Sequence, residues 1–234
     1  SIVVPVFNEE GNIKSLAMEI ENAMSNSIQK WECVWINDGS TDRSKNELLS
    51  LKKPHRVLSH SANFGQSKAF GTGVQASTGK IIVTLDGDGQ NDPSDIPAML
   101  KLLGHDYDVI QGVRLKRRDS YVRSILSRIA NSSSRKLLKS ELSDLGCSLR
   151  VVKREFIDGI ELIGEVHRVL SYYLVRNGAK ILEVPVNHRY RKHGKSKYGY
   201  NRILKFILDL MLVSFLSKFR EKALYYFGTL ATVT

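Results

Sequence analysis

The stretch "IIVTLDGDGQNDPSD" (residues 81–95) joins an apolar run to four acids, Asp86, Asp88, Asp92 and Asp95. Residues 81–85 have the pattern of a short buried strand, and the aspartates begin where that strand is expected to end. Carboxylates this close repel one another, and each raises the pKa of its neighbour unless a positive charge lies between them. The segment therefore predicts a strand whose carboxyl end needs a cation.

Strand and helix patterns alternate along the first 112 residues. Short apolar runs predict strands at residues 2–7, 33–37, 56–59, 81–85 and 108–112. Helical patterns lie between them at residues 9–27, 42–52, 66–77 and 94–104. This alternation predicts an α/β fold with a mostly parallel central sheet between helices. We expect one catalytic domain over residues 1–199, with a further strand at 180–187.

Polar clusters follow four of the expected strands. They read "FNEEGN", "NDGSTD", "SANFGQ" and "DGDGQND" in chain order. Ligands of open parallel sheets bind outside the carboxyl ends of the strands. The four loops therefore predict one pocket at one edge of the sheet.

The Asp-x-Asp motif at residues 86–88 suits a divalent cation. Mg²⁺ and Mn²⁺ prefer oxygen ligands and often complete their coordination shell with substrate phosphates. The alternative is an exposed acidic turn in which Asp92 caps a helix that begins at Pro93. The apolar run before the motif favours the metal site.

Two further motifs each allow two interpretations. In "NDGSTD" (37–42), Asp38 could bind a base or ribose while Gly39 lets the ligand approach the backbone, or the motif could be a turn that caps a helix. The basic loop "HRYRKHGKSK" (188–197) could be a phosphate clamp or a solvated face.

The charge of the 234-residue chain is uneven. Its net charge is +11, which divides into −4 over residues 1–112 (10 basic, 14 acidic) and +15 over residues 113–234 (25 basic, 10 acidic). The second half therefore predicts an anionic partner: phosphorylated molecules, an anionic membrane surface or nucleic acid. Cys33 and Cys147 are too few for a disulfide framework.

The C-terminal residues predict contact with a membrane. Residues 200–222 include "ILKFILDLMLVSFLSKF", an apolar stretch that Lys205, Asp209 and Lys218 interrupt. This pattern favours an amphipathic helix that lies in the membrane interface. Residues 223–234 could begin a transmembrane segment, although they are shorter than the ~20 apolar residues that a span needs. The apolar end also suggests a homo-oligomer.

Nine motifs, taken together and in this order, resemble the family 2 glycosyltransferases. They are "VPVFNEEGNI", "INDGSTD", "NFGQSKAFGTG", "LDGDGQNDP", "GVR", "SRIAN", "DLGCSLRVVKRE", "VHR" and "HGKSKYG". The resemblance runs from Ile2 to about Ile207 and is to the polyprenyl-phosphate branch typified by dolichol-phosphate mannosyltransferase. It implies a GT-A fold, a nucleotide-sugar donor and a metal-dependent hexosyltransferase that uses Mg²⁺ or Mn²⁺.

The resemblance also implies roles for individual residues. The nucleotide-sugar site would comprise Pro5, Asn8, Glu9, Asp38, Gly39, Asp86, Gly87, Asp88, Arg191, Ser196 and Lys197. The metal would be held by Asp86, Asp88 and Gln90, and the catalytic residues would be Asp86, Asp88, Arg114 and Arg128. The acceptor site would comprise Arg128, Asn131, Asp144, Ser148 and Arg150. The Gln-x-x-Arg-Trp signature of processive synthases is absent, since the only tryptophans are Trp31 and Trp35.

We therefore expect inverting transfer of a sugar from a UDP- or GDP-linked donor to undecaprenyl or dolichyl monophosphate. The reaction would take place at the cytoplasmic face of a membrane. A phosphate whose second pKa is about 6 is largely ionised at pH 7, so it needs no strong general base, and the sequence shows no convincing His–Asp pair.

Two alternative functions fit the sequence less well. A sugar-phosphate nucleotidyltransferase would carry a Gly-rich, basic loop after the first strand, where this chain has the acidic "FNEEGN". A nucleic-acid-binding module would explain the basic half but would leave the four polar loops without a function. We expect no nucleic-acid partner.

Overall fold

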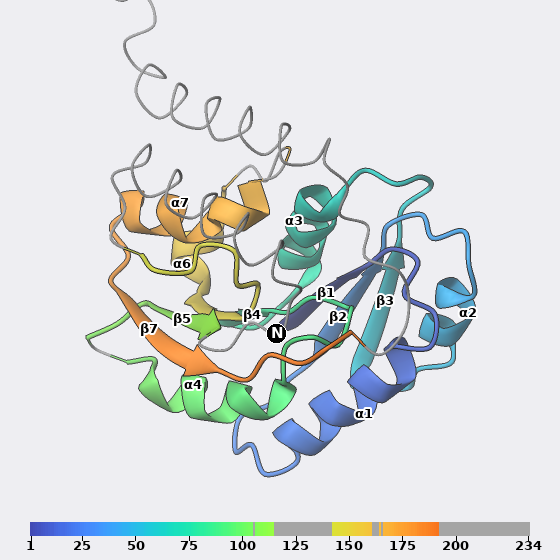
Figure 1. Ribbon diagram of the computed structural model, residues 1–234, viewed down its shortest axis with the longest axis horizontal. Coiled ribbons are helices and arrows are strands. Elements are labelled where there is room, and N and C mark those ends of the chain that lie inside the picture. Colours follow the sequence, from blue (N-terminus) through green and yellow to red (C-terminus); the bar gives the residue numbers. More distant parts are fainter. Residues whose placement is uncertain (105, 115–141, 161–163, 165, 192–234) are drawn as a thin grey trace, which may run out of the picture.

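The computed structural model describes residues 1–104, 106–114, 142–160, 164 and 166–191, and of Val166 and Arg168 it describes the backbone alone (Figure 1). Within these residues one sheet of seven strands has the order β3-β2-β1-β4-β6-β5-β7. The strands are β1 (Ile2–Val6), β2 (Cys33–Asn37), β3 (His55–Ser59), β4 (Ile81–Thr84), β5 (Val109–Arg114), β6 (Arg150–Lys153) and β7 (Ile181–Val186).

The sheet is mostly parallel, as the alternating pattern predicts. Strands β1 to β4 are parallel to their neighbours in that group, and β7 is parallel to β5. Strand β6 runs antiparallel to both β4 and β5, between which it lies. Its register places Arg150 opposite Thr84, at the end of β4 where the aspartate segment begins.

Helices cover both faces of the sheet, as Figure 1 shows. The apolar cluster on one face includes residues of α1 (Ile13–Met24), α2 (Ser44–Leu49) and α4 (Ile96–Leu102). The cluster on the other face includes residues of α3 (Gln66–Ala76), α6 (Arg154–Ile157) and α7 (Leu170–Arg176). Two short 3-10 helices, η1 (Pro93–Asp95) and η2 (Val166–Val169), precede α4 and α7.

The central strands are buried on both faces, which explains their continuous apolar sequence. Every residue of β1 and β2 is buried. The largest of these side chains, Trp35, is 0% exposed, and its indole N–H donates to Nδ1 of His55 at 3.0 Å. Burial of each such apolar side chain stabilises the fold by about 1.5–3 kcal/mol.

Helix α1 begins later than the sequence predicts. The expected helix spans residues 9–27, whereas α1 starts at Ile13. Residues 8–11 instead hydrogen-bond through their backbone N–H groups to side chains of residues 40–47, for example from Glu9 to the Ser44 hydroxyl at 2.8 Å. The loop that follows β1 is therefore hydrogen-bonded to the segment that follows β2.

The C-terminal predictions lie outside the described residues. These are the interface helix at 200–222 and the apolar segment at 223–234. Within the part of the chain that the structure describes, every helix is too short or too polar to cross a membrane.

Candidate active site

The loops after β1 and β2 meet at one edge of the sheet. The Asn8 side chain accepts from the backbone N–H of Thr41 at 2.8 Å and donates to its hydroxyl at 3.2 Å. Asn8 has φ of 52°, a left-handed conformation that asparagine tolerates better than most residues. Gly39 has φ of +69°, and a Cβ there would lie 2.4 Å from the carbonyl carbon of Ala62. Any side chain at position 39 would overlap the backbone of Ala62, so this position requires glycine.

The Asp38 carboxylate holds the loop that follows β3. It is 2% exposed and accepts from the backbone N–H groups of Phe64 at 3.0 Å and Gly65 at 2.8 Å. Its Oδ1 also lies 2.7 Å from Nδ1 of His60. In this conformation the hydrogen bonds of the Asp38 carboxylate therefore go to residues 60–65 of the protein.

The Asp38–His60 contact is a His–Asp pair that the sequence did not reveal. The second ring nitrogen of His60 lies 3.0 Å from the hydroxyl of Thr72. Both nitrogens of the imidazole therefore have protein partners, an arrangement that suits a structural pair better than a general base.

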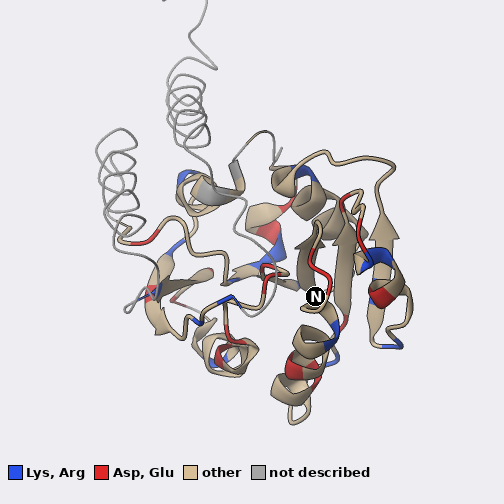
Figure 2. Cartoon of the chain, turned by 45° about the vertical axis from the view of Figure 1, so that its right-hand side comes forward, with Lys and Arg blue, Asp and Glu red and all other residues tan. Residues whose placement is uncertain are grey.

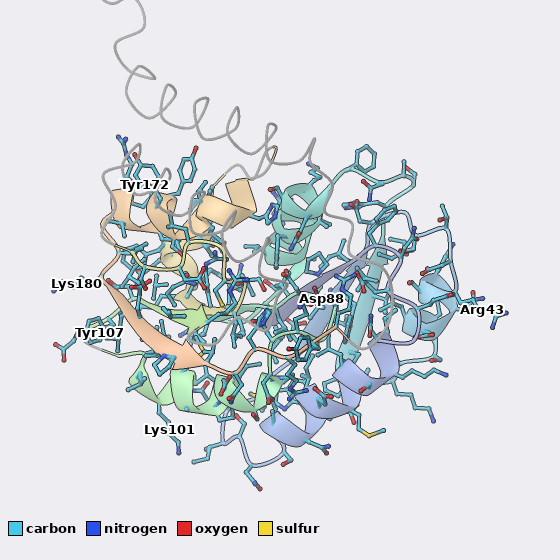
Figure 3. The ribbon with its side chains drawn as sticks, in the orientation of Figure 1. Arg43, Asp88, Lys101, Tyr107, Tyr172 and Lys180 are labelled. Atoms are coloured by element: carbon cyan, nitrogen blue, oxygen red, sulfur yellow. The ribbon has the colours of Figure 1, made fainter. Side chains whose placement is uncertain are left out.

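Asp86 and Asp88 follow β4 and point toward different partners. Oδ1 of Asp86 accepts from the Gln66 side-chain amide at 2.6 Å. Oδ2 of Asp88 lies 2.8 Å from the guanidinium of Arg191. Asp88 is labelled near the centre of the molecule in Figure 3, whereas Arg43, Lys101 and Lys180 lie at its periphery.

Gly87 lets the chain between the two aspartates pass close to β1. A Cβ at this position would lie 2.8 Å from the carbonyl oxygen of Pro5 and 3.1 Å from a methyl group of Val6. Pro5 is itself buried in β1. The close contact between Gly87 and Pro5 thus places Asp86 and Asp88 beside the end of β1.

The environment of Asp86 disfavours its ionised form. Burial is the largest cause and the charge of Asp88 adds to it, so the pKa of Asp86 rises to about 6 from its ordinary value of 3.8. A hydrogen bond from Ser148 and the charges of Arg150 and Arg114 act in the opposite direction. A cation between the two carboxylates would relieve this repulsion.

The residues fit a divalent cation that shares its shell with a ligand. Two carboxylates of an Asp-x-Asp motif reach one region, and oxygen is the donor that Mg²⁺ and Mn²⁺ prefer. Within the described ranges no group of three or more His, Cys, Asp or Glu side chains could hold a metal ion. Gln90, predicted as a third ligand, donates to the carbonyl oxygen of Arg189 at 3.4 Å.

Asp92 and Asp95 have different partners, supplied by the segment after β7. Asn187 donates to Asp95 through its backbone N–H at 2.7 Å and through its side chain at 2.9 Å. Two residues later, Arg189 binds Asp92 through two nitrogens and Glu19 of α1 at 2.7 Å. We call residues 187–191 the basic strap. Figure 2 shows acidic and basic segments near each other around the middle of the fold.

Arg191 is the third contact of the basic strap. Its guanidinium pairs with Asp88 at 2.8 Å and with Glu9 at 3.4 Å. Asn187, Arg189 and Arg191 alternate along the chain, so an extended segment presents them in the same direction. The strap thus supplies positive charge to Asp88 and Asp92 from a part of the chain about 100 residues away.

The described residues of the predicted acceptor site, Asp144, Ser148 and Arg150, all have protein partners. Arg114 binds Asp144 in a bidentate pair, with both nitrogen–oxygen distances at 2.8 Å. The Ser148 hydroxyl accepts from Asn91 at 2.7 Å. Arg150 is 1% exposed and donates to Gln111, Ser171 and the carbonyl oxygen of Leu145. This interior position fits structural support of the site better than direct contact with an acceptor.

The structure brings together most of the predicted site residues. Those gathered at the sheet edge are Pro5, Asn8, Glu9, Asp38, Gly39, Asp86, Gly87, Asp88, Gln90, Arg191, Arg114, Asp144 and Ser148. The predicted residues Arg128, Asn131, Ser196 and Lys197 lie outside the described residues.

Sequence reasoning assigned no role to Gln66, His60 or Arg189. Gln66 and His60 stand in the segment that follows β3, at the predicted sheet edge, so their place in the chain was a signal. For Arg189 the signal was its alternate spacing with Asn187 and Arg191. Its partners Asp92 and Glu19 are remote in sequence, and nothing local identifies them.

Solved structures define the fold class. A crystal structure of glucosyl-3-phosphoglycerate synthase from Mycobacterium tuberculosis, in complex with Mn²⁺, uridine diphosphate and glucosyl-3-phosphoglycerate, superposes with a TM-score of 0.68 at 20% identity. The match covers 92% of this chain and 78% of that chain. It shows that this chain has the fold of the GT-A glycosyltransferases, as its motifs predicted.

The sequence comparisons go one step further. The chain belongs to glycosyl transferase family 2, whose model matches residues 1–160. It is 36% identical over 241 residues to a dodecaprenyl-phosphate galacturonate synthase of Rhizobium johnstonii, covering 98% of this chain and 70% of that protein. It is 31% identical over 237 residues to an undecaprenyl-phosphate 4-deoxy-4-formamido-L-arabinose transferase of Edwardsiella ictaluri, covering 100% and 72%.

Family membership confirms the resemblance seen in the nine motifs. The chain is a glycosyltransferase, and this assignment replaces the nucleic-acid-binding and nucleotidyltransferase alternatives.

Proposed function

We propose that this chain transfers a sugar, with inversion at the anomeric carbon, from a nucleotide-diphosphate sugar to a polyprenyl monophosphate. The curated relatives with printed polyprenyl-phosphate names support this acceptor class. The single observation that carries the proposal is the pair Asp86 and Asp88 at the carboxyl end of β4, with Arg191 as a counter-cation. We place the reaction at the cytoplasmic membrane face, where residues 200–222 would lie in the interface.

Asp86 and Asp88 would hold a divalent cation, Mg²⁺ or Mn²⁺. When bound, the cation supplies positive charge to the donor diphosphate and to the leaving nucleoside diphosphate. Arg191 pairs with Asp88 and Glu9 and offsets part of their negative charge. It would contact the donor diphosphate, which guanidinium groups bind well because their N–H donors match phosphate oxygens.

Positioning and charge neutralisation would supply most of the rate enhancement. The acceptor phosphate is largely dianionic at pH 7, because the second pKa of a phosphate monoester is about 6. It can attack without a strong base, which agrees with the engagement of both His60 nitrogens. Arg114, held in place by Asp144, would contact a phosphate, and Arg128 and Asn131 would bind the acceptor headgroup.

The nucleotide would lie against Asn8, Asp38 and Gly39. Gly39 lets the backbone turn tightly there, and Asn8 holds the two loops together. The transfer assay with UDP- and GDP-sugars decides whether the donor carries uridine or guanosine.

A transfer assay tests the proposal. Purified full-length chain is incubated in detergent with undecaprenyl phosphate, Mn²⁺ and a panel of UDP- and GDP-sugars, and the lipid fraction is analysed by mass spectrometry. One donor should yield a glycosyl phosphate lipid, with inverted anomeric configuration by NMR, and Asp88→Asn should abolish it. Transfer to a soluble acceptor but never to the lipid phosphate would contradict the proposed acceptor class.

A further inference from the structure

Gln66 contacts the site but takes no part in the function described above. It is the first residue of α3, and its side-chain amide donates to Oδ1 of Asp86 at 2.6 Å. A donor on one oxygen of a metal-binding carboxylate constrains the direction in which that carboxylate faces, and such outer contacts tune metal affinity.

The residue before Gln66 is tied to the nucleotide side of the site. Gly65 donates its backbone N–H to Asp38 at 2.8 Å and has φ of +92°. No atom lies within 4 Å of the position of an added Cβ at Gly65, so the conformation rather than lack of space requires glycine there. The chain therefore enters α3 at a point fixed by the end of β2.

The residue after Gln66 is tied to a different part of the molecule. Ser67 is 1% exposed, and its hydroxyl lies 2.8 Å from Nδ1 of His167 in η2. The same hydroxyl accepts from the backbone N–H of His167 at 3.1 Å. The contacts of both neighbours fix the backbone of Gln66 at the start of α3, from where its amide reaches Asp86.

We propose that Gln66 is a positioning residue for Asp86, and that Asp38 and His167 set its direction through Gly65 and Ser67. The proposal rests on the proposed function, because it takes Asp86 to be a ligand of the cation and its diphosphate. The proposal makes Asp38 a link between the nucleotide pocket and the metal site. The Asp38 carboxylate binds residues 60–65 and, through Gly65, fixes the start of α3.

The test measures Mn²⁺ binding to the full chain by electron paramagnetic resonance, with thermal unfolding alongside. Gln66→Leu removes the amide at nearly constant size, and Gln75→Leu, at an exposed position of the same helix, is the matched control. We expect Gln66→Leu to raise the Kd for Mn²⁺ about 10-fold or more. Its unfolding midpoint should match that of Gln75→Leu, which a purely structural role of Gln66 would not give.

Ser67→Ala is a second, milder test that keeps the amide. Loss of the contacts with His167 should raise the Mn²⁺ Kd about 2- to 10-fold, the range for one lost hydrogen bond. A Mn²⁺ Kd equal to that of wild type in Gln66→Leu would overturn the inference, and a wild-type Kd in Ser67→Ala would overturn the part assigned to His167.

Asp88→Asn separates this inference from the proposed function. If wild type binds Mn²⁺ and Asp88→Asn does not, while Gln66→Leu binds like Gln75→Leu, the inference fails and the metal site stands. If Asp88→Asn binds Mn²⁺ as wild type does, the proposed metal site itself fails.

Discussion

The two halves of the segment 81–95 use the same residue type in opposite ways. Asp92 and Asp95, the outer pair, are matched by the basic strap through Arg189 and Asn187. Asp86 and Asp88, the inner pair, are only partly matched: Arg191 pairs with Asp88, while Asp86 is held by the neutral Gln66 amide and carries a pKa raised to about 6. Charge that the protein balances stabilises the fold, and charge left partly unbalanced is available for a ligand.

The pKa values of Asp92 and Asp86 are shifted in opposite directions. Burial tends to raise the pKa of Asp92, but hydrogen bonds from Arg189 and Ser94 outweigh it, and the result lies below the ordinary value. For Asp86, burial and the charge of Asp88 outweigh the favourable contacts. The four acids that this basic chain gathers in one segment thus differ in their partners: the outer pair contacts the basic strap, and we propose that the inner pair binds a cation.

The largest expected effect is on the inner pair. Asp88→Asn should lower sugar transfer about 10³-fold, because it removes a charge that would hold the metal and its diphosphate. The thermal unfolding midpoint should change little, since the substitution also removes one of two repelling charges. Transfer rates and thermal unfolding of Asp88→Asn and Asp95→Asn are compared. An equal loss of transfer in Asp95→Asn would erase the distinction between the pairs.

The pH dependence of metal binding is the next expected effect. Below about pH 6 Asp86 is protonated, so Mn²⁺ must displace a proton, and its affinity should fall about tenfold for each pH unit. Without metal, Asp86 lowers the free energy of unfolding as the pH rises from about 4 to about 6, because the folded state holds the proton more tightly than the unfolded state. Calorimetric Mn²⁺ titrations from pH 5 to 7.5 measure this. A flat profile would contradict the raised pKa.

For Asp92 of the outer pair the pH dependence has the opposite sign, whereas burial raises the pKa of Asp95 above its ordinary value. The lowered pKa of Asp92 means that its contribution to stability is present above the ordinary value of 3.8 and is lost as the pH falls through the folded value.

Breaking the basic strap should affect stability more than binding. Arg189→Met removes the contacts with Asp92 and Glu19, and we expect the free energy of unfolding to fall by about 1–2 kcal/mol, a modest value because the Arg189 side chain is 31% exposed. Urea unfolding measures the change, and the Mn²⁺ Kd should stay close to that of wild type. A loss of Mn²⁺ binding without loss of stability would mean that the strap acts on the site rather than on the fold.

Asp95→Asn should have the smallest effect. The amide keeps an oxygen that can accept from Asn187, and burial already raises the pKa of Asp95 above its ordinary value. Removing the charge therefore also removes a burial cost, and the free energy of unfolding should change by less than about 1 kcal/mol. Urea unfolding at pH 7 checks this. A much larger loss would show that the charge of Asp95, and not its hydrogen bonds, holds the strap.

Much of the fold could be predicted from the sequence because its signals are local. The runs that became β1, β2 and β4 are apolar except for Asn37 and Thr84 at the ends of β2 and β4, since both faces of the sheet are covered. The convergence of four polar loops then follows from parallel strands. The start of α1 was misjudged, because residues 8–11 are recruited by side chains some 30 residues away.

The pairing within the site could not be predicted in the same way. The basic residues after β7 face several acids, and only the folded chain selects Asp92 and Glu19 for Arg189 and Asp88 and Glu9 for Arg191. Arg150 gives the same lesson: the resemblance assigned it to the acceptor site, but the antiparallel insertion of β6 between β4 and β5 places it in the interior.

The most direct test of the central claim is calorimetric binding of UDP and GDP, each with and without Mn²⁺, to wild type, Asp88→Asn and Asp95→Asn. The account predicts Mn²⁺-dependent binding of one nucleotide that is retained by Asp95→Asn and lost by Asp88→Asn. Equal binding by all three proteins, or loss in both variants alike, would contradict the division of the four aspartates into a ligand-binding pair and a fold-holding pair.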